Sequence, residues 1–467
     1  MITFQDLLKV EGDENARMKL CLSIINEHKT SPMYDEAIVA AEYDKQRNVT
    51  ITNYQKLLYT ISGAAVPDNF SSNHKCASNF FHRFVVQQTQ YLLGNGIAFD
   101  DSNIKDALGG DKFDVVLKNI GRESLIAGVS FGFFNLDHVE VFKLTEFAPL
   151  YDEETGQLKA GVRFWQLAPE KPLRFTLYEM DGFTEYIKPE EKEPTVYKEK
   201  RPYVVKYAIT DAGEEMISAR NYPGFPIVPC YGNNQQSMLV GMRENIDCYD
   251  LIKSGFANDV DDASLIYWTL ENAGGMDEVD LAKFVERMKT VKAAVVDGDA
   301  GAHAEAHTVD VPTNARETAL TRIEADLYRD AMALNVNQIS GGNITATAIM
   351  AAYDPQDGNA NDFEDSIVDF VDGILALAGF DGNTKYIFKR SRIANQMEET
   401  QMIISAAQFL DNETIVRHLP FLSSDEIDGV LLRLTREEAA RFEDAGDDAE
   451  AGLAEEAAEA EQEESAE

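Results

Sequence analysis

The sequence predicts an α+β protein in which helices come first, an antiparallel run of strands follows, and the second half is mainly helical. Two observations lead to this class. Apolar residues recur at helical spacing in the first 127 residues, whereas residues 130–209 alternate between β-prone runs and turn residues. From Gly241 the composition changes and long helical patterns return. With 44% hydrophobic and 10% aromatic residues, most of the chain is able to build a packed core.

The first 240 residues contain three helical patterns and five β-prone runs. Residues 2–30 and 102–127 have helical spacing, and residues 76–93 are the clearest helix, which Gly94-Asn95-Gly96 ends. Turns such as Asp152–Gly156 and Met180-Asp181-Gly182 separate the strands. The predicted strands are Ser130–Phe134, His138–Phe142, Gly161–Leu167, Leu173–Glu179 and Tyr203–Ile209.

The second half is predicted to begin with two helices, 242–263 and 313–334, and the latter places an apolar stripe on one face. Between them we expect β-prone runs and a short helix. These are the runs 265–270, 291–296 and 308–311 and the helix 277–290. A polar, glycine-rich connection over 335–347 precedes a helix over 359–378. A short strand at Tyr386–Phe388, further helices to Phe442 and an acidic tail over 443–467 complete the chain.

Charge excludes several classes of function. There are 81 acidic and 42 basic residues in the 467, which gives −39, and the tail 443–467 contributes −12 of this. Such a surface repels phosphate, so tight binding of DNA, RNA or anionic lipid is not expected. No apolar run approaches the roughly 20 residues that span a bilayer, and the start lacks a secretory signal pattern. Four dispersed cysteines, Cys21, Cys76, Cys230 and Cys248, suit a reducing compartment. We therefore expect a soluble, intracellular protein.

One motif is typical of serine hydrolases. Gly128-Val129-Ser130-Phe131-Gly132 matches the G-x-S-x-G turn that exposes a nucleophilic serine between a strand and a following helix. Here a helix precedes the motif and a strand follows it, and no glycine-rich oxyanion loop lies upstream. The structural reading, a strand starting against a helix, is favoured. A serine hydrolase using Ser130 remains the alternative.

No other motif points to catalysis or to a metal. Two histidines at positions i and i+4 of a helix can both bind one zinc ion, and His303 and His307 have this spacing. Their neighbouring residues, however, predict a turn and a strand. No phosphate-binding G-x-x-x-x-G-K-[ST] occurs, and 81 acids make chance carboxylate pairs too common to single out a dyad. The residues predict a non-enzymatic protein without metal or cofactor.

Three stretches resemble the portal (head–tail connector) proteins of long-tailed bacteriophages, particularly those of Gram-positive hosts. They are Asn73-His74-Lys75 with the helix ending Tyr91-Leu92-Leu93-Gly94-Asn95, Ile344–Ile349 with Ala351–Pro355, and Leu410–Pro420 with Glu437-Glu438. Their order and spacing agree over about residues 35–442. Many relatives carry S-G-x-A-L-K where this chain has Thr345–Met350 without the lysine, so no role is assigned to that base.

The resemblance implies a portal-type subunit that forms a ring, commonly of twelve copies. Its parts would be an α+β wing, long stem helices, a small α/β clip and a helical crown. They map to 1–240 (wing), 241–263 and 314–334 (stem helices), 264–313 (clip), 335–358 (tunnel loop), 359–392 (long helix returning to the wing), 393–442 (crown) and 443–467 (acidic disordered tail).

The resemblance also implies a place and a set of partners. The ring would sit at one capsid vertex of the virion, after synthesis in the host cytoplasm, and conduct double-stranded DNA during packaging and ejection without gripping it. Its protein partners would be its own copies, the terminase large subunit, the head–tail adaptor, the scaffold and the major capsid protein, with no membrane. An acidic cytosolic scaffold without a channel is a second alternative.

Two groups of candidate site residues follow from this resemblance. The polar residues of the tunnel loop, which break contact with phosphate quickly, are Asn337, Gln338, Asn343, Thr345 and Thr347. The clip contains a basic patch that suits an acidic partner or a neighbouring subunit, formed by Lys283, Arg287, Lys289 and Lys292.

Overall fold

The protein is analysed as a computed structural model. It describes residues 2–60, 63–69, 71–190, 192–210, 213–263, 267–271, 303–307, 312–336, 346–380, 384–391 and 403–419, with short pieces at 279, 286, 422, 427 and 429–436. The chain divides into two compact units, Met1–Ser391 and Arg392–Glu467.

Four helices open the first unit: α1 (Phe4–Lys9), α2 (Glu14–Lys29), α3 (Pro32–Asp44) and α4 (Val49–Asn53). The single helix predicted over 2–30 is wrong, because Gly12 adopts φ +90° and breaks it. Asp13 then caps α2 by accepting a hydrogen bond from the backbone N–H of Ala16 at 3.0 Å. The apolar periodicity continues across this break, so spacing alone did not reveal it.

A five-stranded antiparallel sheet lies under α2. Its strands, in spatial order, are β10 (Thr195–Arg201), β9 (Gly182–Lys188), β8 (Leu173–Glu179), β7 (Leu158–Trp165) and β6 (Phe147–Tyr151). Cys21, Ile24 and Ile25 of α2 share one core with Val162 and Phe175 of the sheet. The predicted strands 161–167 and 173–179 are confirmed by β7 and β8, while the other three strands were not predicted.

A second, three-stranded sheet forms the centre of the unit: β13 (Ile227–Tyr231), β4 (Val129–Asn135) and β5 (His138–Lys143), with β4 in the middle. Residues 129–134 are buried, because helices cover one face of β4 and aromatic residues cover the other. Gly132 is required there, since a Cβ would lie 2.5 Å from the Phe370 ring. The predicted strands 130–134 and 138–142 are confirmed.

The helices against this sheet include α5 (Phe80–Leu93), α6 (Ser102–Ala107) and α7 (Asp111–Ala127). Gly109 and Gly110 both have positive φ, so the single helix predicted over 102–127 is two helices. The helix predicted over 76–93 is α5, which starts four residues later. Next to it, β3 (Ile97–Phe99) pairs with β16 (Tyr386–Phe388), the predicted short strand.

The remaining strands form separate two-stranded hairpins. They are β1 (Leu57–Tyr59) with β2 (Ala65–Pro67), β11 (Val204–Thr210) with β12 (Gly213–Arg220), and β14 (Tyr267–Glu271) with β15 (His303–His307). The predicted strands 203–209 and 265–270 correspond to β11 and β14. The predicted helix 277–290 and strands 291–296 and 308–311 lie almost entirely outside the described residues.

Three long helices complete the first unit: α8 (Arg243–Ala263), α10 (Thr313–Asp330) and α12 (Ala346–Ala378). Helix α12 corrects a prediction, because residues 346–358 were expected to continue a loop and are helical. Its Pro355 and Gly358 read as helix breakers, but Tyr353 and Ala360 pack with Tyr91 in a small core. That packing outweighs the local preference for a turn.

The second unit is described from residue 403. It contains a short helical stretch, a 3-10 turn at Ala407–Phe409, helix α14 (Asn412–His418) and helical residues 429–436. Asp411 caps α14 by accepting from the Thr414 N–H at 3.0 Å. The tail 443–467 lies outside the described residues. None of the helices described combines the length and apolar composition needed to cross a bilayer.

Candidate functional site

Neither predicted group of binding residues is described with its side chains. Asn337, Gln338, Asn343 and Thr345 lie outside the described residues, and so do Lys283, Arg287, Lys289 and Lys292. The backbone of Thr347 belongs to α12, within its first turn. Both groups therefore remain predictions, and the helices α8, α10 and α12 lead to them.

Ser130 is not a nucleophile. It lies inside β4, is fully buried, and its hydroxyl donates a hydrogen bond of 2.8 Å to the Ile120 carbonyl oxygen. The residue pairs in register with Cys230 of β13 and Lys143 of β5, so no turn exposes it. The serine hydrolase reading of the G-x-S-x-G motif is wrong, because the motif starts a central strand.

His303 and His307 lie at the two ends of β15 and not on a helix. Within the described residues no group of three or more His, Cys, Asp or Glu is arranged to hold a metal ion. The helical zinc spacing considered from the sequence therefore has no helix to support it.

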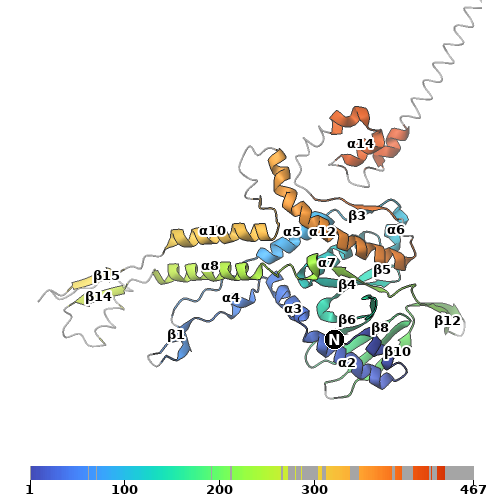
Figure 1. The fold of residues 1–467 in the computed structure, drawn as a ribbon, viewed down its shortest axis with the longest axis horizontal. Helices are drawn as coiled ribbons and strands as arrows, with labels where there is room; N and C mark the ends of the chain where they lie inside the picture. Colours follow the sequence, from blue (N-terminus) through green and yellow to red (C-terminus); the bar gives the residue numbers. More distant parts are fainter. Residues whose placement is uncertain are drawn as a thin grey trace, which may run out of the picture. The chain divides into compact units, whose positions relative to one another are not determined.

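The best-defined feature next to the predicted sites is the antiparallel pair of helices α8 and α10, which lie side by side (Figure 1). Two contacts fix their register: Arg316 pairs with Asp259, and the Asn245 amide donates to Asp330 at 3.1 Å. The contacts are 14 residues apart on both helices (259 − 245 and 330 − 316). The pair therefore runs without a slip over about 21 Å, at 1.5 Å per residue.

Along the described residues of α10, the buried positions lie at the base of this pair. Leu327 and Tyr328 are buried, and Tyr328 stacks edge-on against Phe84 with ring centroids 5.2 Å apart. Towards the other end of α10 the exposure rises, and Leu320 and Ile323 of the predicted stripe are only partly buried. The predicted apolar face exists, but one copy of the chain covers it incompletely.

On its other side, α8 is hydrogen-bonded to an extended segment, residues 72–78. Backbone N–H groups donate to side chains of α8: His74 to Asn258 Oδ1 (2.6 Å), Cys76 to Ser254 Oγ (2.9 Å) and Ser78 to Asp250 Oδ1 (2.8 Å). Two residues of extended chain advance about 6.6 Å, and four residues of helix advance about 6 Å. The two repeats match, so alternate amides meet every fourth helical residue. We name this set the polar ladder.

Asp250 is the innermost member of the polar ladder. Its carboxylate is fully buried and also accepts from the Asn48 amide, which in turn donates to the Ser78 carbonyl at 3.1 Å. Burial raises the pKa of Asp250 above its usual value of 3.8, and the hydrogen bonds from Asn48 and Ser78 oppose that rise. One turn earlier, Asp247 accepts from Tyr43 and, at 2.6 Å, from Thr50. On this side, α8 is thus held by polar and charged side chains that accept hydrogen bonds from residues 43–78.

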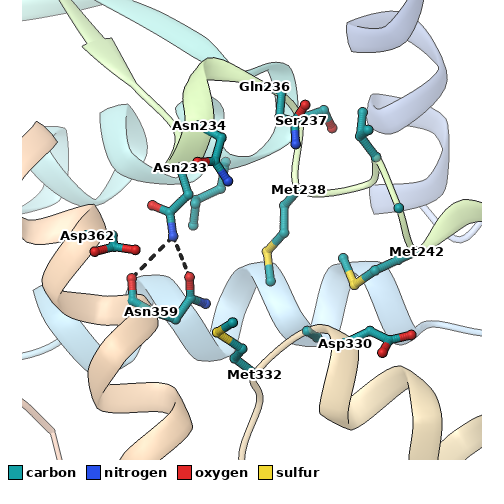
Figure 2. Close-up of a pocket in the computed structure, with 14 residues that line it drawn as sticks. Asn233, Asn234, Gln236, Ser237, Met238, Met242, Asp330, Met332, Asn359 and Asp362 are labelled. Atoms are coloured by element: carbon teal, nitrogen blue, oxygen red, sulfur yellow. Dashed lines mark hydrogen bonds between the residues drawn. The ribbon is translucent and has the colours of Figure 1, made fainter.

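A pocket of about 250 Å³ lies where α8 begins, α10 ends and α12 passes (Figure 2). Asn233 bridges to Asn359 of α12 by donating to its backbone carbonyl at 3.2 Å and to its side-chain oxygen. Three lining residues, Asn234, Gly241 and Met332, have positive φ, so the chain turns sharply at each. Its lining includes no histidine, lysine or cysteine, and Ser237 is buried and accepts from the Leu239 N–H. The pocket lies at the joint between α8, α10 and α12.

A further cluster fixes α12 beside this joint. Arg390, which follows β16, pairs with Asp357 at 3.0 Å and Glu364 at 2.7 Å, and Tyr91 of α5 donates to the same Asp357. The residues come from three separate parts of the chain. They hold the first half of α12 in place directly after the predicted tunnel loop.

The sequence analysis missed the polar ladder. Its members on α8, Asp250, Ser254 and Asn258, recur at i, i+4 and i+8, a polar stripe that the sequence does contain. The stripe alone does not identify its partner, because the extended segment lies more than 170 residues earlier in the chain.

Comparison with known proteins gives a consistent result. The family described as "Phage portal protein, SPP1 Gp6-like" matches residues 41–452. The portal protein of Clostridium phage phiCD119 is 23% identical over 399 residues, covering 76% of this chain and 83% of the relative. The portal protein of Bacillus phage SPP1 is 24% identical over 441 residues, covering 86% and 83%.

Solved structures from gene transfer agent particles also align with the chain. The neck of the empty particle, computed with C6 symmetry, aligns at TM-score 0.41 and 10% identity, over 74% of this chain and 91% of that one. The neck of the native particle, computed with C12 symmetry, aligns at TM-score 0.40 and 10% identity. The alignment covers 74% of this chain and 91% of that one.

Proposed function

The chain belongs to the SPP1 Gp6-like family of phage portal proteins, and from this membership we propose that its copies close into a ring at one capsid vertex. The ring is the conduit for double-stranded DNA during packaging and ejection. It is also the docking platform for the terminase large subunit and the head–tail adaptor. The observation that carries this proposal is the family match over residues 41–452, which spans both helices of the α8–α10 pair.

The helix pair supports ring formation on physical grounds. One copy covers the base of α10 but leaves Leu320 and Ile323 only partly buried. Covering them with a different surface of a neighbouring copy gains roughly 25 cal/mol for each Å² of apolar surface removed from water. A head-to-tail contact of this kind repeats from copy to copy and closes when the rotation permits. Twelve copies are the common number in this family.

The parts of the subunit follow from the resemblance, with one adjustment. The wing is 1–240, the stem helices lie within 241–263 and 314–334, the clip is 264–313 and the crown is 393–442. The tunnel loop is shorter than 335–358, because α12 begins at Ala346. The helix 359–392 returns to the wing as the second part of α12 and β16.

DNA must move past the tunnel loop without being held. Lysine and arginine give DNA affinity by releasing counterions, and each added cation strengthens binding. The polar residues predicted for this loop offer only neutral hydrogen-bonding groups; they are Asn337, Gln338, Asn343, Thr345 and Thr347. Replacing Asn343 and Thr345 with lysine should slow or stall packaging, while glutamine at both positions, which adds length without charge, should not. Unchanged packaging with the lysines would refute this role.

The basic patch of the clip is the proposed contact for terminase and the adaptor. Reversing the charges of Lys283, Arg287, Lys289 and Lys292 should weaken docking, mainly through slower association, and leave rings intact. The matched control reverses four exposed lysines of the wing, Lys171, Lys192, Lys198 and Lys206. Docking that persists after reversal in the clip would reject the assignment.

The same proposal places the ring in the virion, beside the scaffold and the major capsid protein during assembly, after synthesis in the host cytoplasm. No catalytic step is assigned to this chain. The deciding experiment is negative-stain microscopy of the purified protein together with its mass in solution. Annular particles with a central hole support the portal. Compact particles without a hole in every buffer would favour the acidic scaffold and reject the conduit.

Ring formation should also depend on salt. With −39 formal charges per copy, subunits repel one another, and added salt screens that repulsion. The fraction of subunits in rings should therefore rise between low ionic strength and about 0.5 M salt, where the Debye length has fallen to a few Å. A ring fraction that falls with salt would mean that attraction between charges drives assembly.

A further inference from the structure

Among the described strands, β1 and β2 form a sheet of their own. Its two strands pair only with each other, and all six strand residues are exposed. Four large apolar side chains are exposed: Leu57 (46%), Leu58 (43%), Tyr59 (73%) and Val66 (40%). A lone two-stranded hairpin in water is marginally stable, so a second surface is needed to cover these side chains.

The hairpin is also uncharged. Residues 57–67 contain no Asp, Glu, Lys, Arg or His, in a chain that is 26% charged and carries −39. A basic partner would be attracted to the acidic surface elsewhere, and not to this segment. A second copy of the same anionic chain, in contrast, is best tolerated where charge is absent. The charge pattern therefore favours a second copy as the partner.

The hairpin is fixed to helix α8 at both of its ends. Before it, Thr50 of α4 donates to Asp247 at 2.6 Å, and after it the polar ladder binds residues 74–78. The tip is closed by the Gly63 N–H donating to the Thr60 carbonyl at 2.8 Å. Both ends of the hairpin are therefore anchored to α8 before any partner binds, which lowers the entropy cost of association.

The hairpin and helix α10 lie on opposite sides of α8 (Figure 1). The ladder residues centre on Ser254, whereas Asn245 and Asp259 face α10. At 3.6 residues per turn these two directions are roughly 160° apart around α8. One copy thus presents the hairpin on one flank and α10 on the other, which is the arrangement a head-to-tail ring requires.

The outer side of α10 is suited to receive the hairpin. Residues turned away from α8 are exposed and mostly small or basic; they are Asn314, Thr318, Thr321, Arg322, Ala325 and Arg329. Exposed Glu317 lies at the edge of this side, and Arg329 pairs with Asp326 at 2.5 Å. Small side chains there leave room for Leu57 and Leu58. An arginine among them can stack on Tyr59, a contact worth about 0.5–2 kcal/mol.

We propose that the β1–β2 hairpin of one copy packs on the outer side of α10 of the next copy. This contact rests on the proposed ring and names the surfaces that close it. It is heterologous, so each copy donates one hairpin and receives another. The polar ladder binds the segment that follows the hairpin to α8, and so anchors that end of the hairpin.

Cysteine crosslinking tests the pairing directly. Tyr59→Cys is combined in turn with Thr318→Cys, Thr321→Cys and Ala325→Cys, in a Cys248→Ser background that removes an exposed native thiol. Within one copy the two positions lie on opposite sides of α8, so a bond forms only between copies. Oxidised rings should give a series of disulfide-linked multimers on a non-reducing gel for at least one double variant. No single variant should give such multimers. If none of the three double variants forms covalent multimers in intact rings, the proposal is overturned.

A charge substitution gives a second, independent measurement. Tyr59→Asp should raise the subunit concentration at which half of the protein is in rings by about tenfold or more, since a carboxylate would be buried at the contact. Leu167→Asp, at an apolar position 86% exposed after β7, is the matched control and should change it little. Equal effects of the two would overturn the proposal. If the wild-type protein forms no rings, the proposed function itself fails, and that outcome is distinct.

Discussion

Replacing Asp250 is the sharpest test of how α8 is held. Asp250→Ala removes the acceptor of the buried Ser78 N–H and one acceptor of the Asn48 amide, while Asn48 keeps its bond to the Ser78 carbonyl. A buried donor without a partner costs about 1–3 kcal/mol. Returning a buried carboxylate to water offsets part of this loss. We expect Asp250→Ala to lower the free energy of unfolding by about 1–2 kcal/mol.

Asp250→Asn is the matched variant, because its side-chain oxygen still accepts from Ser78 and it has no charge to desolvate. It should cost less than about 1 kcal/mol. Chemical denaturation followed by circular dichroism measures both variants, and hydrogen exchange of the Ser78 amide reports the local effect. Equal losses for alanine and asparagine, or no loss for alanine, would refute the role of the ladder in holding the segment 72–78 on α8.

The pH dependence has a definite sign. Burial raises the folded-state pKa of Asp250 above 3.8, so the folded protein binds this proton more tightly than the unfolded chain does. The stabilisation from this group is complete below pH 3.8 and is lost as the pH rises through the raised pKa. The stability of the wild-type protein relative to Asp250→Asn should therefore increase on acidification towards pH 4. An increase on going to higher pH would contradict the desolvation of Asp250.

Three further variants probe the same region. Ser254→Ala leaves the Cys76 N–H without its acceptor, so its amide exchange should quicken about fivefold, with Ser254→Thr restoring it. Gly255→Ala should stabilise α8 by about 0.5–1 kcal/mol in thermal unfolding, because an added Cβ meets only Arg316 at 3.5 Å; a lower melting temperature would contradict this. Arg390→Leu leaves two carboxylates of α12 facing each other and should cost about 2 kcal/mol, and no loss would argue against the cluster.

The local sequence pattern predicted helices and strands correctly where the residues of one segment are enough to specify its structure. The five predicted strands are present, since alternation and turn residues specify them without reference to distant partners. Glycines show the limit of that reading. Gly12 and Gly109 interrupt helical periodicity by adopting positive φ, but Gly255 and Gly358 lie inside helices. Whether a glycine breaks a helix depends on the packing around it, which the sequence does not state.

The same limit explains the two largest differences around the site. The G-x-S-x-G motif at Ser130 satisfies a pattern but lies in a central strand, between β13 and β5. Helix α12 runs through Pro355 because Tyr353 packs against Tyr91 at a ring distance of 5.8 Å. In both cases residues far away in the sequence decide the outcome, and no local motif contains them.

The polar ladder adds a reason for choosing polar side chains at a buried contact. An apolar stripe on α8 would hold an extended segment without fixing its position, since a shift along the helix exchanges one apolar contact for another. Asp250, Ser254 and Asn258 each accept one particular amide, so any shift breaks all three hydrogen bonds and leaves the buried Ser78 N–H unpaired. The ladder therefore sets the position of the β1–β2 hairpin along α8. If that hairpin closes a ring, the register between neighbouring copies is set by hydrogen bonds inside each copy.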